Sequence, residues 1–398
     1  MMQSLRDVHE DATSSTSGDP LSIYTYNEQK NRWTRTSYAR HPGSTDGSLV
    51  NSYSTTSPSR VRILTWNVDF FSPNASERLK CILSYIQCTL FSCHEEQHAP
   101  ESCVILFQEV EAEVLPLLLS SPWLRAHFQM APISNFSWPN RSHYGCVMLV
   151  SKDIGITRAR NLIFKGSHQS RAALIMDILL SAPREDETET NKFIEVQYQE
   201  ESRNLTYRES DEFISSKEAE GSRQYPLAVF RIANVHLESL PQGANERRQQ
   251  LALIAQALQA RDEDKVDNLL GGMVCGDMNS ICASDRDLHS EVGLLDAYLL
   301  NAASAGAADD DIHDVDGLTW GFQPISTYPP GRLDKVLHTP APDLSANTGS
   351  ASFVSFTVDA PTRVGVGLKI EDDQFASSHV GLSTTLTVCT KMCTSRMM

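Results

Sequence analysis

Long apolar segments are absent from this 398-residue sequence, and no run approaches the roughly 20 apolar residues that a membrane-spanning helix needs. The first fifteen residues, MMQSLRDVHEDATSS, also lack the apolar core of a secretory signal. These two absences predict an intracellular protein that is not secreted and has no membrane partner.

Paired cysteine motifs are absent as well. The nine cysteines are an odd number, and no two of them form a C-x-x-C pair. Several fall within apolar runs, where a free thiol packs as a small core residue. We therefore expect reduced thiols, and neither disulfides nor a zinc site.

Basic side chains are few: 34 Lys and Arg residues face 50 Asp and Glu residues, which gives a net charge of −16. This balance excludes a broad basic face that would coat nucleic acid, although an enzyme could still hold a nucleic-acid end in a local basic groove. Residues 155–174 contain Arg158, Arg160 and Arg171 and no acidic residue. They form a candidate phosphate track, and the alternative is a strand with one solvated face.

The composition divides the chain into an N-terminal tail, one large domain and a short C-terminal tail. Residues 1–58 are rich in small polar residues and predict a disordered tail. Residues 59–391 have the apolar patterning of a catalytic domain, interrupted at 183–222 by 12 acidic and 5 basic residues that predict a mobile acidic insertion. Residues 392–398 form a C-terminal tail.

Strand patterns dominate the domain, and helix patterns are interspersed among them. VRILTWNV, CVILFQEV, YGCVMLVS, RAALIMDILL and LAVFRIANVHL predict strands, whereas apolar spacing predicts helices from about residue 76 and over 245–260. We also expect strands and loops in LLDAYLL and in the segments that follow it. The order is not a strict strand–helix alternation, so we expect two sheets packed face to face with helices outside.

Polar signatures stand where strand patterns end. Glu109 follows an apolar run that ends in Phe107, and Asp277 and Asn279 follow Met273-Val274-Cys275. A carboxylate at the end of a buried strand needs a cation or hydrogen-bond donors nearby. Taken alone, Asn67 would more often be a turn residue and His379 a structural histidine.

Together these residues fit phosphodiester hydrolysis, which needs a hard cation, a base for water and donors for the phosphoryl oxygens. Glu109 suits Mg²⁺, and Asn67 can add a neutral oxygen or a hydrogen bond beside it. Asp277 can deprotonate the attacking water, while Asn279 positions the water or the phosphate.

Imidazole groups complete the set of residues. His236 and His379 are candidate donors to the phosphoryl oxygens. Asp334, in RLDKV, can fix the tautomer of one of them and raise its pKa.

Six motifs in this order, TWNVDF, FQEV, NVHLES, GDMN, RLDKV and SSHVGL, resemble those of the endonuclease/exonuclease/phosphatase superfamily. Within it the sequence is most similar to the tyrosyl-DNA phosphodiesterase 2 branch, on the strength of HLES, the following ERRQQL and the TW at 319–320. The resemblance covers roughly residues 60–390, apart from the insertion. It implies a DNase I-like α/β fold, a four-layer α/β/β/α sandwich with two central mixed sheets.

By matching motif position, the resemblance implies that Glu109 binds Mg²⁺, with Mn²⁺ as a substitute, assisted by Asn67 and Asp69. It also implies that Asp277 and Asn279 act on the water and the transition state, and that His379 contacts the phosphate. The resemblance also makes Arg171 a DNA-binding candidate. Arg247 and Trp320 are further substrate-binding candidates, although Arg247 could equally form a helix-surface ion pair and a tryptophan at a strand end more often packs in the core. Ser378 stands where the family has Asp near the metal or its waters, which predicts weaker metal binding, with loss of activity as the alternative.

The implied activity is hydrolysis of a phosphotyrosyl bond at a single-stranded DNA 5′ end, as in DNA repair, and it implies a location in the nucleus or the cytoplasm. Two alternatives remain open. One keeps the fold with another substrate, as an RNA deadenylase or nuclease, an inositol-phosphate phosphatase or a sphingomyelinase. The other is a catalytically weakened acidic interaction protein.

Overall fold

The computed structural model describes residues 18–39, 57–183, 226–260, 268–304, 317–342, 352–371 and 373–392. Seven strands form the first sheet, in the order β1 (Asp19–Pro20), β8 (Gly155–Ile163), β9 (Ala172–Ser181), β10 (Leu227–His236), β11 (Leu269–Asp277), β13 (Asp334–His338) and β12 (Leu295–Asp296). We call it sheet A.

Sheet B has nine strands, and eight of them follow the order β14 (Ser352–Val358), β18 (Gly381–Met392), β4 (Arg60–Asn67), β5 (Cys103–Glu111), β7 (Tyr144–Ser151), β6 (Phe128–Ala131), β2 (Ile23–Asn27) and β3 (Arg32–Thr36). The ninth, β15 (Thr362–Val364), pairs with β18 outside this path. A separate small hairpin joins β16 (Lys369–Glu371) to β17 (Gln374–Phe375).

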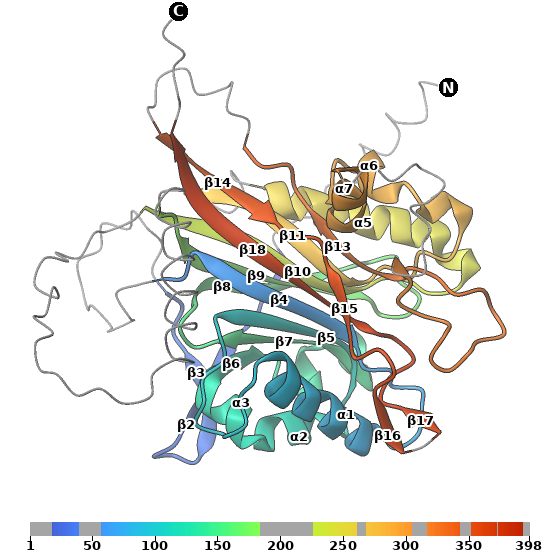
Figure 1. The fold of residues 1–398 in the computed structure, drawn as a ribbon, viewed down its shortest axis with the longest axis horizontal. Helices are drawn as coiled ribbons and strands as arrows, with labels where there is room; N and C mark the ends of the chain where they lie inside the picture. Colours follow the sequence, from blue (N-terminus) through green and yellow to red (C-terminus); the bar gives the residue numbers. More distant parts are fainter. Residues whose placement is uncertain are drawn as a thin grey trace, which may run out of the picture.

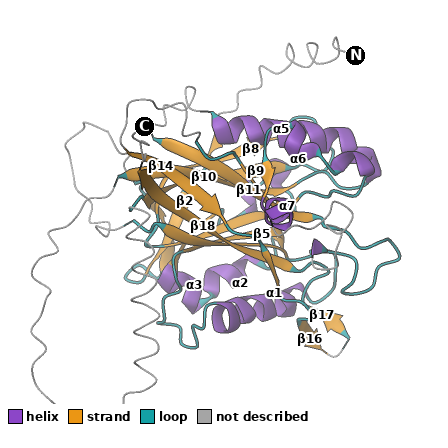
Figure 2. Ribbon diagram, turned by 45° about the horizontal axis from the view of Figure 1, so that its top comes forward, coloured by secondary structure: helices purple, strands orange, loops and turns teal. Residues whose placement is uncertain are grey.

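Helices cover the outer face of each sheet, as Figure 2 shows. Sheet B carries α1 (Ala75–Ser84), the π-helix that continues it (Tyr85–Leu90), α2 (Leu115–Ser120) and α3 (Pro122–His127). Sheet A carries α5 (Ala244–Gln259) and α6 (Leu288–Glu291) on its outer face, whereas α7 (Ala297–Ser304) packs against β12 and β13. The expected four-layer sandwich of helices, two mixed sheets and helices is confirmed (Figure 1).

Strand alternation explains the layers, because successive side chains point to opposite faces. In β9, Leu174 and Met176 face the core between the sheets, while Ala173 and Ile175 face the helices of sheet A. Both faces are therefore buried, which is why these strands read as nearly continuous apolar runs in the sequence.

The N-terminal region differs from the expectation. Residues 1–58 were predicted to be a disordered tail, but within them residues 18–39 form strands that join both sheets, so that prediction is wrong for this segment. β1 pairs with β8 of sheet A, and β2 pairs with β6 of sheet B. Leu21 and Ile23 reach the core between the sheets. The apolar side chains of this segment are few in the composition of residues 1–58, yet Leu21, Ile23 and Tyr26 are buried.

Two smaller points complete the comparison. LLDAYLL was expected to form strands and loops, but only Leu295 and Asp296 are a strand, and Ala297 to Leu300 belong to α7. The predicted acidic insertion at 183–222 and the C-terminal tail at 392–398 lie almost entirely outside the described residues. Among the described helices, none combines the length and the apolar character needed to cross a membrane.

Candidate active site

Strand directions bring the signature residues to one edge of the sandwich. β4 and β5 run parallel, so Asn67 and Glu109 end together, and β10 and β11 run parallel, so His236 lies opposite Asp277. β13 is antiparallel to β11 and starts at this edge, with Asp334 opposite Asp277. The two sheets thus contribute complementary parts of one site.

Glu109 reaches the site through an irregularity in β5. The register between β5 and β7 shifts between Phe107 and Val110, and Glu109 has a positive φ of 59°. A bulge of this kind redirects a side chain away from the regular alternation. Asp69 and Asn279 also have positive φ, 58° and 47°, at the ends of the neighbouring strands. Each of the three strand ends thus carries a left-handed residue beside the cluster.

Gly276 lets β11 approach β10 closely at the residue before Asp277. It has a φ of 137°, and a Cβ there would lie 2.0 Å from the carbonyl oxygen of Val235. Any larger residue would push apart the strand ends that carry His236 and Asp277. The glycine of the GDMN motif therefore serves the geometry of the site.

Asn67 links the two carboxylates. Its Nδ2 donates to Oε1 of Glu109 at 3.1 Å and to Oδ2 of Asp277 at 3.0 Å, while its Oδ1 accepts from the backbone N–H of Asp69 at 2.9 Å. Of the two roles considered for Asn67, the structure shows the hydrogen bond. Its side chain holds Glu109 from sheet B and Asp277 from sheet A together.

The donor set suits a divalent cation. Ligand atoms of Glu109, His236 and Asp277 lie within 4.8 Å of one another. Burial raises the pKa of Glu109, and hydrogen bonds from Asn67 and Phe70 offset only part of that rise. Burial and the nearby Asp334 raise the pKa of Asp277. Two buried carboxylates this close are stabilised in their ionised form by a bound cation.

His379 carries a positive charge held by Asp334. Its Nδ1 lies 2.7 Å from Oδ2 of Asp334, and its Nε2 lies 3.9 Å from Oδ2 of Asp277. Burial lowers the pKa of His379, but the charge and the hydrogen bond of Asp334 outweigh it and raise the pKa to about 10. Trp320 lies beside the imidazole, with 6.5 Å between the ring centroids.

His236 is held in the opposite state. Its Nδ1 lies 2.8 Å from Nη1 of Arg171, which can only donate, so this nitrogen accepts and the ring proton is on Nε2. Nε2 lies 3.5 Å from Oε1 of Glu109 and 3.6 Å from Oδ2 of Asp277. Burial, and then the charge of Arg171, lower the pKa of His236 well below its usual value.

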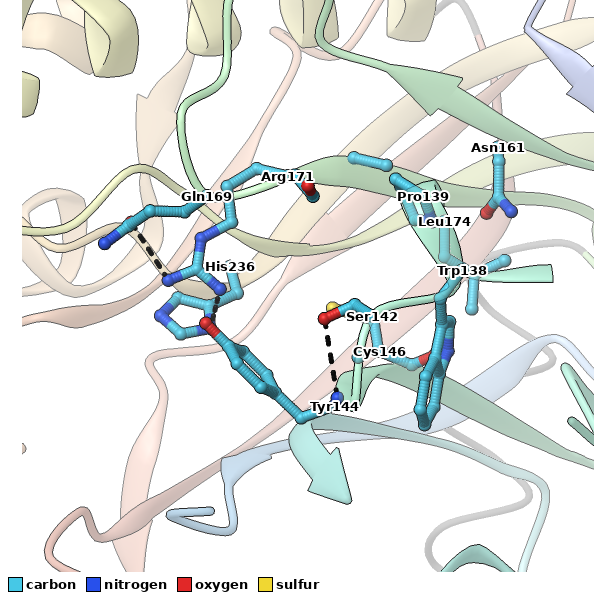
Figure 3. Close-up of a pocket in the computed structure, with 13 residues that line it drawn as sticks. Trp138, Pro139, Ser142, Tyr144, Cys146, Asn161, Gln169, Arg171, Leu174 and His236 are labelled. Atoms are coloured by element: carbon cyan, nitrogen blue, oxygen red, sulfur yellow. Dashed lines mark hydrogen bonds between the residues drawn. The ribbon is translucent and has the colours of Figure 1, made fainter. Parts of the chain in front are cut away.

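A pocket opens beside this cluster (Figure 3). Its cavity volume is about 40 Å³, and it opens to solvent. Arg171, His236 and Tyr144 form the side next to the carboxylates, and Trp138 and Asn161 form the far side. The guanidinium carbon of Arg171 lies 5.5 Å from the centre of the Tyr144 ring, which stacks on Phe70 at 3.9 Å. A substrate phosphate at the cluster could extend a planar group into this space.

Asp69 and Ser378 lie together at the rim. The carboxylate of Asp69 accepts from the hydroxyl of Ser72 at 2.6 Å and from the backbone N–H of Ser378 at 3.4 Å. Burial alone would raise the pKa of Asp69, but the Ser72 hydrogen bond and the charge of Arg78 bring it below its usual value. Among the described residues, Asp69 belongs to neither group of clustered ligand atoms, and its expected part in holding the metal stays a prediction.

Two basic candidates do not serve as predicted. Arg247 is fully buried and binds the carbonyl oxygens of Glu238 and Leu240 and the carboxylate of Asp285. Arg160 is 1% exposed and points to helix α5, where it reaches the carbonyl of Ala257. These two arginines complement buried oxygen atoms and cannot contact a substrate phosphate.

Arg158 is also displaced from the site. In the register of β8 and β9, Ile163 lies opposite Ala172, next to Arg171, whereas Arg158 lies opposite Asp177. At about 3.3 Å per strand residue, Arg158 is roughly 17 Å farther down the strand. Within the predicted phosphate track along 155–174, Arg171 reaches the site, Arg160 is buried away from it, and a contact of Arg158 with nucleic acid stays a prediction.

Tyr144 and Trp138 were not identified from the sequence. Tyr144 begins β7, which runs antiparallel to β5, so it lies at the same edge as Glu109. Trp138 packs on Gly145, where a Cβ would meet its indole at 2.5 Å. The available signal for Tyr144 was an aromatic residue at the start of a strand pattern. The pairing of that strand with β5 is long-range, so the signal did not show that Tyr144 lies near Glu109.

Comparison with known proteins gives the family. Residues 64–350 match the family described as "Endonuclease/Exonuclease/phosphatase family". The chain belongs to this family. Its members are phosphoesterases that generally use a divalent metal, in agreement with the clustered carboxylates. Among curated proteins, none matches the sequence significantly.

Solved structures of family members share the fold. The crystal structure of humanized D. rerio TDP2 with 14 mutations is 16% identical, with a TM-score of 0.51, and the match covers 83% of this chain and 99% of that one. D. rerio TDP2 complexed with a single-strand DNA product gives 16% identity and a TM-score of 0.50, with the same coverage. At this identity the likeness supports the four-layer fold alone.

Proposed function

We propose that this chain is a Mg²⁺-dependent phosphodiesterase that hydrolyses the phosphotyrosyl bond at a DNA 5′ end. The observation that carries the proposal is the pair of buried carboxylates, Glu109 and Asp277, bridged by Asn67 and flanked by one cationic and one neutral histidine. The ordered TWN, HLES and TW motifs favour the tyrosyl-DNA substrate over others. This activity would belong to DNA repair inside the cell.

Glu109 would hold the cation, and the cation would supply positive charge to the phosphoryl oxygens. Asp277 lies at the end of β11, where its carboxylate can orient a water and accept its proton. Asn279, whose backbone N–H donates to Oδ1 of Asp277 at 2.8 Å, keeps that carboxylate in place. Mn²⁺ would satisfy the same oxygen ligands.

The two histidines would divide the stabilisation of charge. His379, cationic through Asp334, can donate a charge-assisted hydrogen bond from Nε2 to the phosphate as negative charge builds. His236 can donate from Nε2 as a neutral group, which adds a hydrogen bond without repelling His379. Arg171 and Tyr144 would face the group attached to the phosphate, and Trp320 could stack on a base of the single strand.

The experiment compares a 5′-phosphotyrosyl oligonucleotide with poly(A) RNA in the presence of Mg²⁺. Release of tyrosine that leaves a 5′-phosphate supports the proposal, and chelation of the metal should abolish it. Shortening of the RNA without tyrosine release would instead make the chain a deadenylase. Inositol phosphates and sphingomyelin, assayed in parallel, test the remaining substrates.

Variants connect the activity to the cluster. Glu109→Ala and Asp277→Asn should each reduce the rate by at least about 10²-fold. Glu113→Gln is the matched control, because it alters an exposed carboxylate just beyond β5. If the wild-type chain turns over none of these esters, the interaction-protein alternative is favoured. If both cluster variants retain the wild-type rate, the activity does not come from this site.

A further inference from the structure

A buried carboxylate that the proposed chemistry does not use lies behind the site. Glu238 follows β10 by two residues and is 2% exposed. Its Oε2 accepts from the hydroxyl of Ser167 at 2.6 Å and from Nε2 of Gln250 on α5 at 3.1 Å. Its Oε1 accepts from the backbone N–H groups of His168 and Gln169, at 3.1 and 3.0 Å. All four donors are neutral.

These hydrogen bonds hold the loop between β8 and β9 against α5, and the loop leads directly to Arg171. Ser167 Oγ, which donates to Glu238, accepts from the backbone N–H of Arg171 at 2.8 Å. Oε1 of Gln169 accepts from Nη2 of Arg171 at 3.2 Å and from the backbone N–H of Ser239 at 2.8 Å. Arg171 is therefore fixed both through its backbone and through its guanidinium.

The position of Arg171 matters because its guanidinium lines the pocket and contacts Nδ1 of His236, whose Nε2 faces the carboxylates (Figure 3). An arginine side chain that is mobile before binding loses rotamer entropy when it contacts a ligand, which weakens binding. An arginine that is already held in its binding position avoids this loss. The loop that presents it is at the surface, since the His168 side chain is 82% exposed. An anchor on the buried side of the loop is the element that keeps the guanidinium in place.

We propose that Glu238 is a positioning residue for substrate binding: it anchors residues 167–169 to α5 and so fixes Arg171 at the boundary between the pocket and the cluster. The effect on substrate rests on the proposed function, but the anchoring itself does not. Arg171 would contact the substrate phosphate or the group attached to it, and Glu238 would act only through Arg171.

Kinetics with the 5′-phosphotyrosyl oligonucleotide test the role in binding. Glu238→Gln keeps the size of the side chain but removes its charge and one acceptor, and Ser167→Ala breaks the same link without changing a buried charge. Each should raise KM about tenfold while kcat changes by less than about threefold. The increase in KM of the double variant should be smaller than the product of the two single increases, because both changes break the same hydrogen bond between Ser167 and Glu238.

Gly166→Ala is the matched control, because a Cβ at Gly166 meets no atom within 4 Å. It changes the same loop without touching the anchor, so its KM should equal that of the wild type. An unchanged KM in both Glu238→Gln and Ser167→Ala would overturn the inference. A rise in KM for Gly166→Ala equal to theirs would overturn it too, since any change in the loop would then suffice.

Amide hydrogen exchange separates this inference from the proposed function. In the full-length chain without substrate, Glu238→Gln should accelerate exchange at His168 and Gln169, and Gly166→Ala should not. If the wild type lacks metal-dependent turnover, the proposed function fails and faster exchange still supports the anchor. Unchanged exchange in Glu238→Gln would refute the anchor whatever the activity.

Discussion

Two histidines near one carboxylate have opposite charge states: burial and Arg171 both favour the neutral ring of His236, whereas Asp334 outweighs burial at His379. His379 has the carboxylate of Asp334 at Nδ1, and His236 has the guanidinium of Arg171 at Nδ1. An anion favours the imidazolium, while a cation favours the neutral ring. Asp334 and Arg171 therefore determine the opposite charges of the two imidazole rings.

Asp334→Asn should shift the alkaline limb of the pH–rate profile. His379 is cationic below its pKa of about 10, so the rate should fall as the pH rises through that value. Asparagine removes the charge that raises the pKa, and the fall should move toward the ordinary value of 6.5. At pH 8, about 1.5 units above that value, we expect a loss of roughly 30-fold in kcat, because only about 3% of the imidazole would then be cationic. An unshifted limb would show that His379 does not act as a cation.

Ser378→Asp tests the departure from the family motif. The new carboxylate would lie beside Asp69, whose Oδ2 accepts from the backbone N–H of Ser378. Without a divalent cation, repulsion between the two carboxylates should give Ser378→Asp a lower Tm than the wild type. With Mg²⁺ this difference in Tm should shrink, because the variant should bind the metal more tightly. Ser378→Asn controls for size. Equal Mg²⁺ affinity in Ser378→Asp and the wild type would show that position 378 does not influence the metal.

At the scale of elements, residues 18–39 close the open side of the sandwich. Within four residues the chain passes from β1 on sheet A to β2 on sheet B, and Leu21 and Ile23 fill the core between them. Backbone hydrogen bonds from Leu21 to Ala159 and from Ala39 to Ile156 fix the segment to β8. It is an integral part of the domain.

Truncation should reveal this contribution. A chain that starts at residue 18 should unfold at the same urea concentration as the full chain, whereas one that starts at residue 59 should lose several kcal/mol. Burial of Leu21 and Ile23 alone contributes about 1.5–3 kcal/mol each. Urea titrations monitored by fluorescence measure both. Equal midpoints for all three chains would contradict the structural role of the segment.

The sequence predicted site residues well where the strand that carries them is enough to identify them. It predicted them poorly where burial depends on pairing or packing with distant segments. Glu109 and Asp277 were identified because each follows an apolar strand. Arg160 and Arg247 were misinterpreted, because a strand or helix pattern does not show which face meets a neighbouring layer. In residues 18–39, β1 and β2 pair with β8 and β6, which lie about 140 and 105 residues further along the chain, and this pairing could not be predicted locally. The hairpin of β2 and β3 is local, and its aromatic and β-branched residues were an available signal that the average composition of residues 1–58 concealed.

For the whole molecule, the site spans the interface of the two sheets. Asn67 and Glu109 come from sheet B, and His236, Asp277 and Asp334 come from sheet A. A cation held by Glu109 beside Asp277 would join both halves of the sandwich and bind only the folded state. The stability of the entire domain is then linked to metal binding.

Mg²⁺ should accordingly raise Tm in a saturable way, by an amount that corresponds to about 2.7 kcal/mol at a concentration 100 times Kd. Scanning calorimetry over a Mg²⁺ series measures the effect. Glu109→Gln should remove it, whereas Glu113→Gln should retain it. A Tm that is independent of Mg²⁺ in the wild type would contradict a cation site that bridges the sheets.

The positive φ of Glu109 implies that function and stability oppose each other at this position. A non-glycine residue in such a conformation costs about 1–3 kcal/mol, and glycine is largely free of that cost. Glu109→Gly and Glu109→Ala should both be inactive, yet the glycine variant should resist urea better, by about 1 kcal/mol. Equal stability would mean that the bulge in β5 is unstrained. If the glycine variant is the more stable one, a carboxylate at position 109 lowers the free energy of unfolding, and its presence is explained by activity.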